Sequence, residues 1–171
     1  MTGGPGPGPR RDPAPAGPLP EEDRRAITEL LGREPAGSYE VAVRRPDGLP
    51  SVIANAPLLR DGTPMPTRYW LVDPDLRHAV SRLESTGGVR AAEAAVDPEA
   101  LAGAHQRYAA ERDLLLPPGH QGPRPAGGVG GTRQGVKCLH AHLAWWLAGG
   151  DDPVGAWVAG ELGVERPRGT A

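Results

Sequence analysis

Apolar and β-branched residues gather in three short runs in the first half of the chain. Residues 39–44 and 51–55 are β-prone, and Pro46-Asp47-Gly48 between them favours a tight turn. A third extended run, residues 68–72, follows a stretch at 61–66 that two prolines interrupt. The pattern therefore predicts a short antiparallel sheet made of a hairpin and a third strand.

Most other segments space their apolar residues at the period of a helix. Residues 21–31 carry a short apolar stripe that ends at Gly32. The pairs Asp73-Pro74 and Asp97-Pro98 each place a side-chain acceptor at N-cap and a preset φ at the first helical position. These pairs predict one helix that ends at Gly87 and a second that runs to about Leu115. A short helix over 89–96 is expected between them.

Two further predictions complete the helical pattern: the buried face of the helix that opens at Asp97, and a last helix near the C-terminus. In the helix that opens at Asp97, the residues expected inward are Leu101, Ala104, Tyr108 and Leu115, whereas Glu111, Arg112 and Asp113 are expected in solvent. Asp151-Asp152-Pro153 predicts a last short helix that contains Val154, Trp157 and Val158. Together the elements predict an α+β fold in which the sheet is packed by about five helices.

Length and composition indicate one domain with two loose ends. The 171 residues, of which 38% are hydrophobic, suffice for a single core, which we place at residues 21–160. Residues 1–20 contain five glycines and seven prolines and predict a disordered tail. Residues 161–171 are expected to form a flexible C-terminal tail. A glycine- and proline-rich loop is expected at 116–132.

The net charge, the single cysteine and the length of the apolar runs argue against nucleic acid binding, an internal disulfide and a membrane span. The formal net charge of −2 disfavours nucleic acid as a partner, because phosphate-backbone binding needs a broad basic surface. One cysteine cannot form an internal disulfide. No apolar signal region follows Met1, and the longest apolar stretch, 138–148, is too short to cross a bilayer. We expect a cytoplasmic protein that does not enter a membrane.

Residues 127–142 hold the densest group of chemically capable side chains. The sequence predicts a helix over 134–148, whose apolar face is formed by Val136, Leu139, Leu143, Trp146 and Leu147. In such a helix Cys138 and His142 share one flank, because positions i and i+4 stack, and His140 projects from the opposite flank.

Our first interpretation of this segment is an anion site. The glycines at 127–135 let backbone N–H groups approach a ligand, and the helix N-terminus, Arg133 and Lys137 supply positive potential. Thr132 and His140 complete the expected set of binding residues. The ligand would be a small anionic or phosphorylated molecule.

Two other interpretations stay open. Cys138 and His142 are candidate catalytic residues of a thiol- or metal-dependent enzyme, and Asp73 is a further weak metal candidate. No cofactor follows from these residues. Alternatively, Trp145, Trp146 and Trp157 form the surface of a non-catalytic protein that binds a protein partner. The sequence does not decide whether the protein is an enzyme.

Four ordered blocks resemble a known bacterial family. They are Leu31-Gly32-Arg33, the block 61–67, Leu83-Glu84-Ser85-Thr86-Gly87 and Val136-Lys137-Cys138-Leu139-His140. In this order, over about residues 22–158, they resemble bacterial domain-of-unknown-function family 501. The resemblance implies a cytoplasmic protein without an established activity, whose genes often lie near those of a septum-formation protein and an exopolyphosphatase-like enzyme. A role linked to cell division is therefore one expectation for the partner-binding alternative.

The resemblance also bears on metal binding. Many members carry Cys-x-Cys-Gly in the hairpin turn and Thr-Cys-Pro before the second helix, which together with Lys-Cys-Leu-His imply a thiolate metal site. This chain has Arg45-Pro46-Asp47-Gly48 and Val72-Asp73-Pro74 at those places, so three of the four thiols are missing. Asp47 and Asp73 are the residues that could replace them as oxygen ligands.

Overall fold

A three-stranded antiparallel sheet forms the centre of the molecule. The computed structural model describes residues 18–168, so most of the predicted N-terminal tail and the last three residues lie outside the described part. The strands β1 (Gly37–Arg44), β2 (Pro50–Leu59) and β3 (Tyr69–Leu71) follow the order β1-β2-β3. The predicted hairpin and third strand are confirmed, and β2 is longer than expected.

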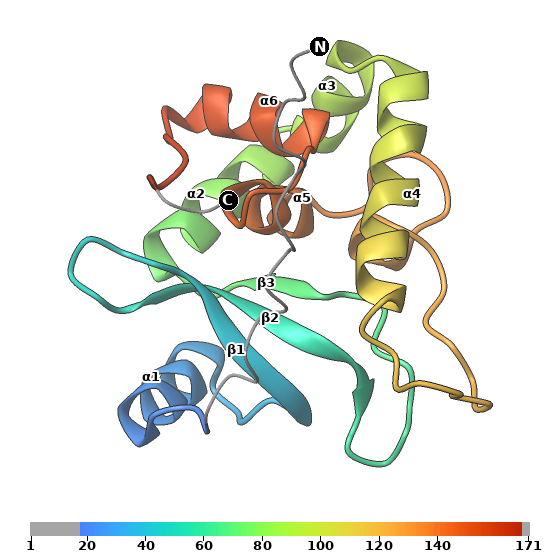
Figure 1. The fold of residues 1–171 in the computed structure, drawn as a ribbon. Helices are drawn as coiled ribbons and strands as arrows, with labels where there is room; N and C mark the ends of the chain where they lie inside the picture. The colour runs from blue at the N-terminus through green and yellow to red at the C-terminus, as the bar shows by residue number, and fades with distance from the viewer. Residues whose placement is uncertain (1–17, 169–171) are drawn as a thin grey trace, which may run out of the picture.

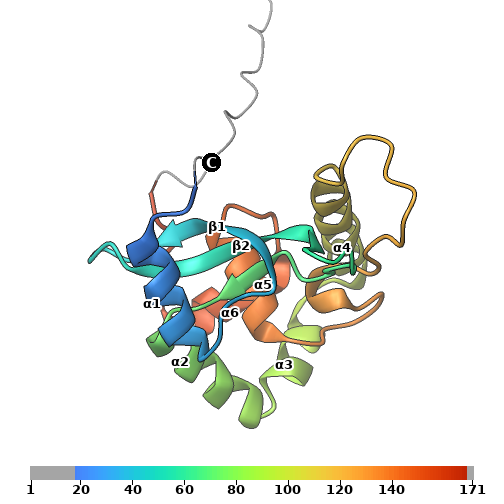
Figure 2. The ribbon, with the colours of Figure 1, turned by 90° about the horizontal axis from the view of Figure 1, so that it is seen from below.

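Helices cover both faces of this sheet, as Figures 1 and 2 show. Helix α1 (Glu21–Leu31) packs on one face, where Ile27, Ile53 and Val72 form a small core. The opposite face carries the larger core and the remaining helices. These are α2 (Pro74–Ser85), α3 (Gly88–Ala95), α4 (Pro98–Asp113), α5 (Leu139–Leu147) and α6 (Pro153–Leu162), with a single 3₁₀ turn at Val129–Gly131. The fold is therefore α+β, as predicted.

Helix α5 lies at the centre of the larger layer. It packs between β3 on one side and α6 on the other. Because Leu139 and Leu143 are fully buried, this short helix is fixed between the sheet and the outer helices. Within residues 18–168, each helix is too short or too polar to cross a membrane.

The Asp-Pro pairs cap their helices as predicted. Asp73 Oδ1 accepts the N–H groups of Asp75 and Leu76, at 2.9 and 3.2 Å. Asp97 and Asp152 cap α4 and α6 in the same way. Such a cap stabilises a helix by about 1 kcal/mol, because it satisfies N–H groups that have no partner within the helix.

The start of α5 differs from the prediction. The helix begins at Leu139, not at Gln134, and Cys138 is the extended N-cap residue with φ −150°. Gly135 has a φ of +65°, which a helix does not allow, and the Glu93 carboxylate accepts the Val136 N–H at 2.7 Å. Contacts with distant side chains therefore hold residues 135–138 out of the helix.

Leu115 was expected inward, but it lies beyond the end of α4 and is 48% exposed. A further difference concerns Arg112. It was expected in solvent, but its side chain is 1% exposed. The guanidinium donates to the carbonyl oxygens of Pro66, Pro125 and Gly127 and to the carboxylate of Asp113. The buried guanidinium holds the loop between α4 and α5 against the rest of the molecule, because the carbonyl groups of Pro125 and Gly127 belong to that loop.

Candidate functional site

Glu84, Cys138 and His140 meet at the junction of α2 and α5. Their potential ligand atoms all lie within 4.8 Å of one another. Glu84 is in the last turn of α2, Cys138 is the N-cap of α5, and His140 is in the first turn of α5. Two helix ends that are far apart in the sequence therefore bring a carboxylate, a thiol and an imidazole together.

Helix α2 fixes the orientation of the imidazole. His140 Nδ1 lies 3.3 Å from Oε1 of Glu84. On the other side of the ring, Nε2 lies 3.2 Å from Ser81 Oγ and 3.2 Å from the carbonyl oxygen of Arg77. Positions 77, 81 and 84 recur at helical spacing, so one face of α2 holds the ring.

The thiol and the imidazole change each other's protonation. Burial raises the pKa of Cys138, but the nearby His140 ring and Ala141 N–H lower it by a larger amount, so the pKa lies below the ordinary value. The neighbouring Cys138 raises the pKa of His140 against the effect of burial, and the charge of Glu84 raises it more. The N-terminus of α5 adds positive potential at Cys138. These effects favour a thiolate beside an imidazolium.

Cys138 and His140 line a pocket at the free edge of β3, which we call the Cys138 pocket. Its volume is about 760 Å³. Cys138 is half-buried, so the thiol can be approached from the pocket. The pocket is lined by Leu31, Arg33, Thr67, Tyr69, Trp70, Leu71, Pro74, Arg77, His78, Ser81, Cys138, His140 and Ala141.

His142 does not lie with Cys138, contrary to the helical projection. Its side chain is 0% exposed, and Nδ1 lies 2.7 Å from Oδ2 of Asp152, whose side chain is also 0% exposed. The His105 ring packs edge-on against it, at 5.9 Å between centroids. The projection was wrong because Cys138 precedes the helix, so the thiol and His142 are not stacked one turn apart.

The other predicted ligand-binding residues are not in the Cys138 pocket. Arg133 and Lys137 are exposed, and the Thr132 hydroxyl donates to the carbonyl oxygen of Gln134 at 2.8 Å. Of the four residues predicted to bind an anion, His140 alone lines this pocket.

The glycine loop is closed by contacts within the protein. His105 Nδ1 accepts the Val129 N–H at 3.1 Å, and Nε2 donates to the carbonyl oxygen of Gly135 at 3.0 Å. A Cβ atom at Gly128 would lie 2.5 Å from His105, so glycine is needed there for packing. Two carboxylates, those of Glu93 and Glu84, accept the Val136 and Leu139 N–H groups. The protein's own side chains thus use N–H groups that the anion interpretation assigned to a ligand.

Asp73 and Asp47, the possible oxygen ligands, surround a cation of the protein itself. Arg45 lies 3.2 Å from Asp47 and 3.6 Å from Asp73, and Asp75 is 3.5 Å away. The hairpin turn and the start of α2 therefore do meet, but an arginine connects them.

The tryptophans in the C-terminal part belong largely to the core. Trp145 is 2% exposed, and its indole N–H donates to Glu111 at 3.0 Å. Trp146 and Trp157 are half-buried, and the Arg166 guanidinium lies 4.6 Å from the Trp146 ring centroid.

Residue-by-residue reasoning missed Glu84, Ser81 and Arg77. Glu84 lies in the block 83–87, and Cys138 and His140 lie in the block 136–140, both of which carried the family resemblance. The structure brings these two blocks into contact, since Glu84 Oε1 accepts the Leu139 N–H at 2.7 Å. Both blocks carry the same family resemblance, and this was the signal that could have placed Glu84 in the site with Cys138 and His140.

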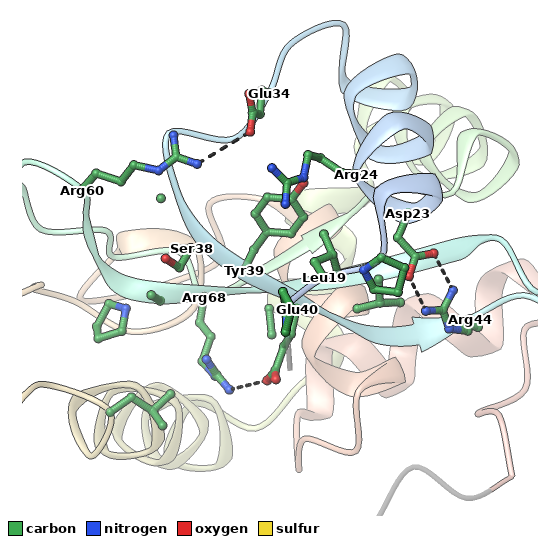
Figure 3. Close-up of a pocket in the computed structure, with 18 residues that line it drawn as sticks. Leu19, Asp23, Arg24, Glu34, Ser38, Tyr39, Glu40, Arg44, Arg60 and Arg68 are labelled. Carbon is green, nitrogen blue, oxygen red and sulfur yellow. Dashed lines mark hydrogen bonds and ion pairs between the residues drawn. The ribbon is translucent and has the colours of Figure 1, made fainter. Parts of the chain in front are cut away.

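A second hollow, the α1 pocket, lies between α1 and the outer face of the sheet (Figure 3). Its arginines are matched by carboxylates. Arg44 holds Asp23 through two hydrogen bonds of 2.8 and 2.7 Å, and Arg68 lies 3.7 Å from Glu40. The remaining pairs are Arg60–Glu34 and Arg24–Glu21. The lining contains neither cysteine nor histidine, so the Cys138 pocket is the better candidate for chemistry.

Comparison with known proteins identifies the family to which the chain belongs. Neither a curated protein nor a solved structure matches the chain. One family model matches residues 41–160, a range that includes Glu84, Cys138 and His140. The chain therefore belongs to the family described as "Protein of unknown function (DUF501)".

Proposed function

We propose that the protein is an enzyme whose nucleophile is the Cys138 thiolate. His140 is its acid–base partner, and Glu84 positions the imidazole and favours its charged form. The observation that carries the proposal is the Cys138 thiol within 4.8 Å of a His140 ring nitrogen, at the surface of a pocket large enough for a small molecule.

The proposed chemistry is hydrolysis through a covalent intermediate. The thiolate attacks an electrophilic carbon of the substrate and forms a C–S bond, while the bond from that carbon to the leaving group breaks. The His140 imidazolium gives its proton to the leaving group. Neutral His140 then takes a proton from water, the hydroxide attacks the same carbon, and the C–S electron pair returns to sulfur.

Three further features support this assignment. A thiolate needs positive surroundings, and Cys138 has the N-terminus of α5 and His140 next to it. An acid–base histidine needs a fixed ring, and Ser81 and Glu84 hold opposite nitrogens of His140. A nucleophile must also be reachable, and Cys138 lines the pocket.

Alkylation of Cys138 by iodoacetamide tests the proposal, because the chain contains no other cysteine. We expect the folded protein to react faster at neutral pH than the same chain unfolded in urea, since a lowered thiol pKa raises the fraction of reactive thiolate. His140→Gln should remove most of this advantage. His120→Gln is the matched control, because His120 does not line the pocket. A folded protein that reacts no faster than the unfolded chain would overturn the proposal.

A mononuclear metal centre is the second candidate, and one observation favours it. Glu84, Cys138 and His140 present carboxylate, thiolate and imidazole ligands, the three types that zinc takes, within 4.8 Å of one another. Elemental analysis of the purified protein separates the two candidates. A stoichiometric metal, together with a Cys138 that iodoacetamide modifies only after chelation, would support the metal centre over the free nucleophile.

A further inference from the structure

The charge of the Cys138 pocket is unbalanced. Arg33 and Arg77 line it, and its lining contains neither aspartate nor glutamate. In the described part of the chain, neither arginine takes part in an ion pair of 4.0 Å or less. The hydrogen bond from Arg77 Nη1 to the Leu30 carbonyl oxygen, at 2.8 Å, fixes that guanidinium without neutralising it. Arg33 lies over the Trp70 ring, 5.6 Å from its centroid.

The α1 pocket provides an internal comparison. Its volume is also about 760 Å³, and each of its arginines is paired with a carboxylate, most of them visible in Figure 3. The uncompensated charge in the Cys138 pocket is therefore not a general property of hollows on this molecule. A pocket with two guanidinium groups that have no carboxylate partner attracts a ligand with an oxyanion, and Cys138 lines the same pocket.

We propose that the substrate of the Cys138 site is a small molecule that carries a carboxylate or phosphate group. This inference rests on the proposed function and adds the substrate class. Arg33 and Arg77 bind the oxyanion, and the electrophilic carbon of the same molecule faces Cys138. Trp70, Leu71 and Pro74 give an apolar wall for the rest of the ligand.

Two alkylating reagents that differ in charge test this inference. Iodoacetate carries a carboxylate, and iodoacetamide is its neutral counterpart. We measure the ratio of their rate constants with Cys138 in the folded protein and in the same chain unfolded in urea. The ratio cancels differences in thiolate fraction. We expect it to be about fivefold higher in the folded protein, because a unit charge about 4 Å away contributes on the order of 1 kcal/mol in water.

Substitutions locate the cation that causes the preference. Arg77→Gln and Arg33→Gln should each lower the ratio, whereas Arg77→Lys should retain most of it. Arg133→Gln and Lys137→Gln are matched controls, because they remove the same charge from residues that do not line the pocket. Inorganic phosphate should slow both reagents in the unmodified protein and should slow neither in the double variant R33Q/R77Q.

The outcomes separate this inference from the proposed function. Fast reaction with iodoacetamide but a ratio no higher than in the unfolded chain would overturn the anionic substrate and leave the nucleophile standing. Slow reaction with iodoacetamide would remove the nucleophile itself. A raised ratio that is lost in Lys137→Gln but kept in Arg77→Gln would place the anion at the glycine loop and contradict the assignment to this pocket.

Discussion

Glu84 and His140 interact through a single carboxylate oxygen, Oε1, which lies 3.3 Å from Nδ1 of the imidazole and also accepts the Leu139 N–H at 2.7 Å. The same atom therefore contacts both the first residue of α5 and the His140 ring. Glutamine at position 84 can keep the backbone contact through its amide oxygen, but it removes the charge that helps to raise the pKa of His140.

We expect the pKa of His140 to fall in Glu84→Gln, with a change in the free energy of unfolding below about 1 kcal/mol. The measurement is an NMR titration of the His140 ring, assigned by its absence in His140→Gln. Glu93→Gln is the control, because Glu93 makes a similar contact with the Val136 N–H but none with His140. An unchanged His140 titration would show that Glu84 does not act on the ring.

His142 and Asp152 are expected to support the fold without taking part in the site. Asp152→Ala removes the buried partner of His142 and the cap of α6, so it should cost about 4 kcal/mol of unfolding free energy. Urea denaturation measures this loss. Asp151→Ala is the control, since Asp151 is 85% exposed in its pair with Arg107, and should cost less than about 1 kcal/mol.

The same variants test the separation of this pair from Cys138. At urea concentrations where Asp152→Ala is folded, its rate of alkylation by iodoacetamide should match that of the unmodified protein. A much slower reaction in the folded variant would instead connect His142 and Asp152 to the thiol.

Arg112 should contribute more to stability than a typical arginine. Arg112→Met leaves the carbonyl oxygens of Pro125 and Gly127 without a buried donor, so we expect a loss of roughly 3 kcal/mol. Chemical denaturation and hydrogen exchange of residues 125–135 measure the loss and its location. Arg107→Met, at an exposed position, should cost less than about 1 kcal/mol. Equal losses in the two variants would contradict the anchoring role.

The part of the fold that the sequence predicted rests on local interactions. Pro46-Asp47-Gly48 sets the hairpin turn through the Asp47 contact with the Leu49 N–H, and Asp73 caps α2 from the position directly before Pro74. In both cases the residues that decide the structure are neighbours in the chain, so their spacing alone carries the information.

The part that it did not predict depends on distant contacts. Periodicity extends α5 back to Gln134, but the carboxylates of Glu84 and Glu93 take N–H groups of Leu139 and Val136 and hold the preceding segment extended. A charged residue such as Arg112 is expected in solvent, but it is buried because carbonyl groups from other segments, those of Pro66 and Gly127, accept its hydrogen bonds. The late start of α5 is also why Cys138 pairs with His140 and not with His142.

The Asp23–Arg44 pair gives a pH-dependent contribution to stability. The hydrogen bond from Arg44 lowers the pKa of Asp23, against the effect of burial. A carboxyl group with a lowered folded-state pKa stabilises the fold above its unfolded-state pKa, and this contribution is lost as the pH falls through the folded-state value. Asp23→Asn should therefore cost about 1–2 kcal/mol at neutral pH, a value reduced by the partial exposure of Arg44.

Urea denaturation across pH measures this contribution. The difference between Asp23→Asn and the unmodified protein should be full at neutral pH and should shrink below about pH 4. Glu21→Gln, in the same turn of α1 but 72% exposed, is the control and should show little difference at any pH. A constant difference down to acid pH would contradict a charge-dependent role for Asp23.

The titration of the Cys138 thiol tests the proposed nucleophile most directly. The ultraviolet absorbance of the thiolate is followed against pH in the folded protein, with Cys138→Ser as the baseline. We expect a midpoint below the value of about 8.5 for a free thiol, and a higher midpoint in His140→Gln. A midpoint at or above that of a free thiol, unchanged in His140→Gln, would contradict the proposed nucleophile.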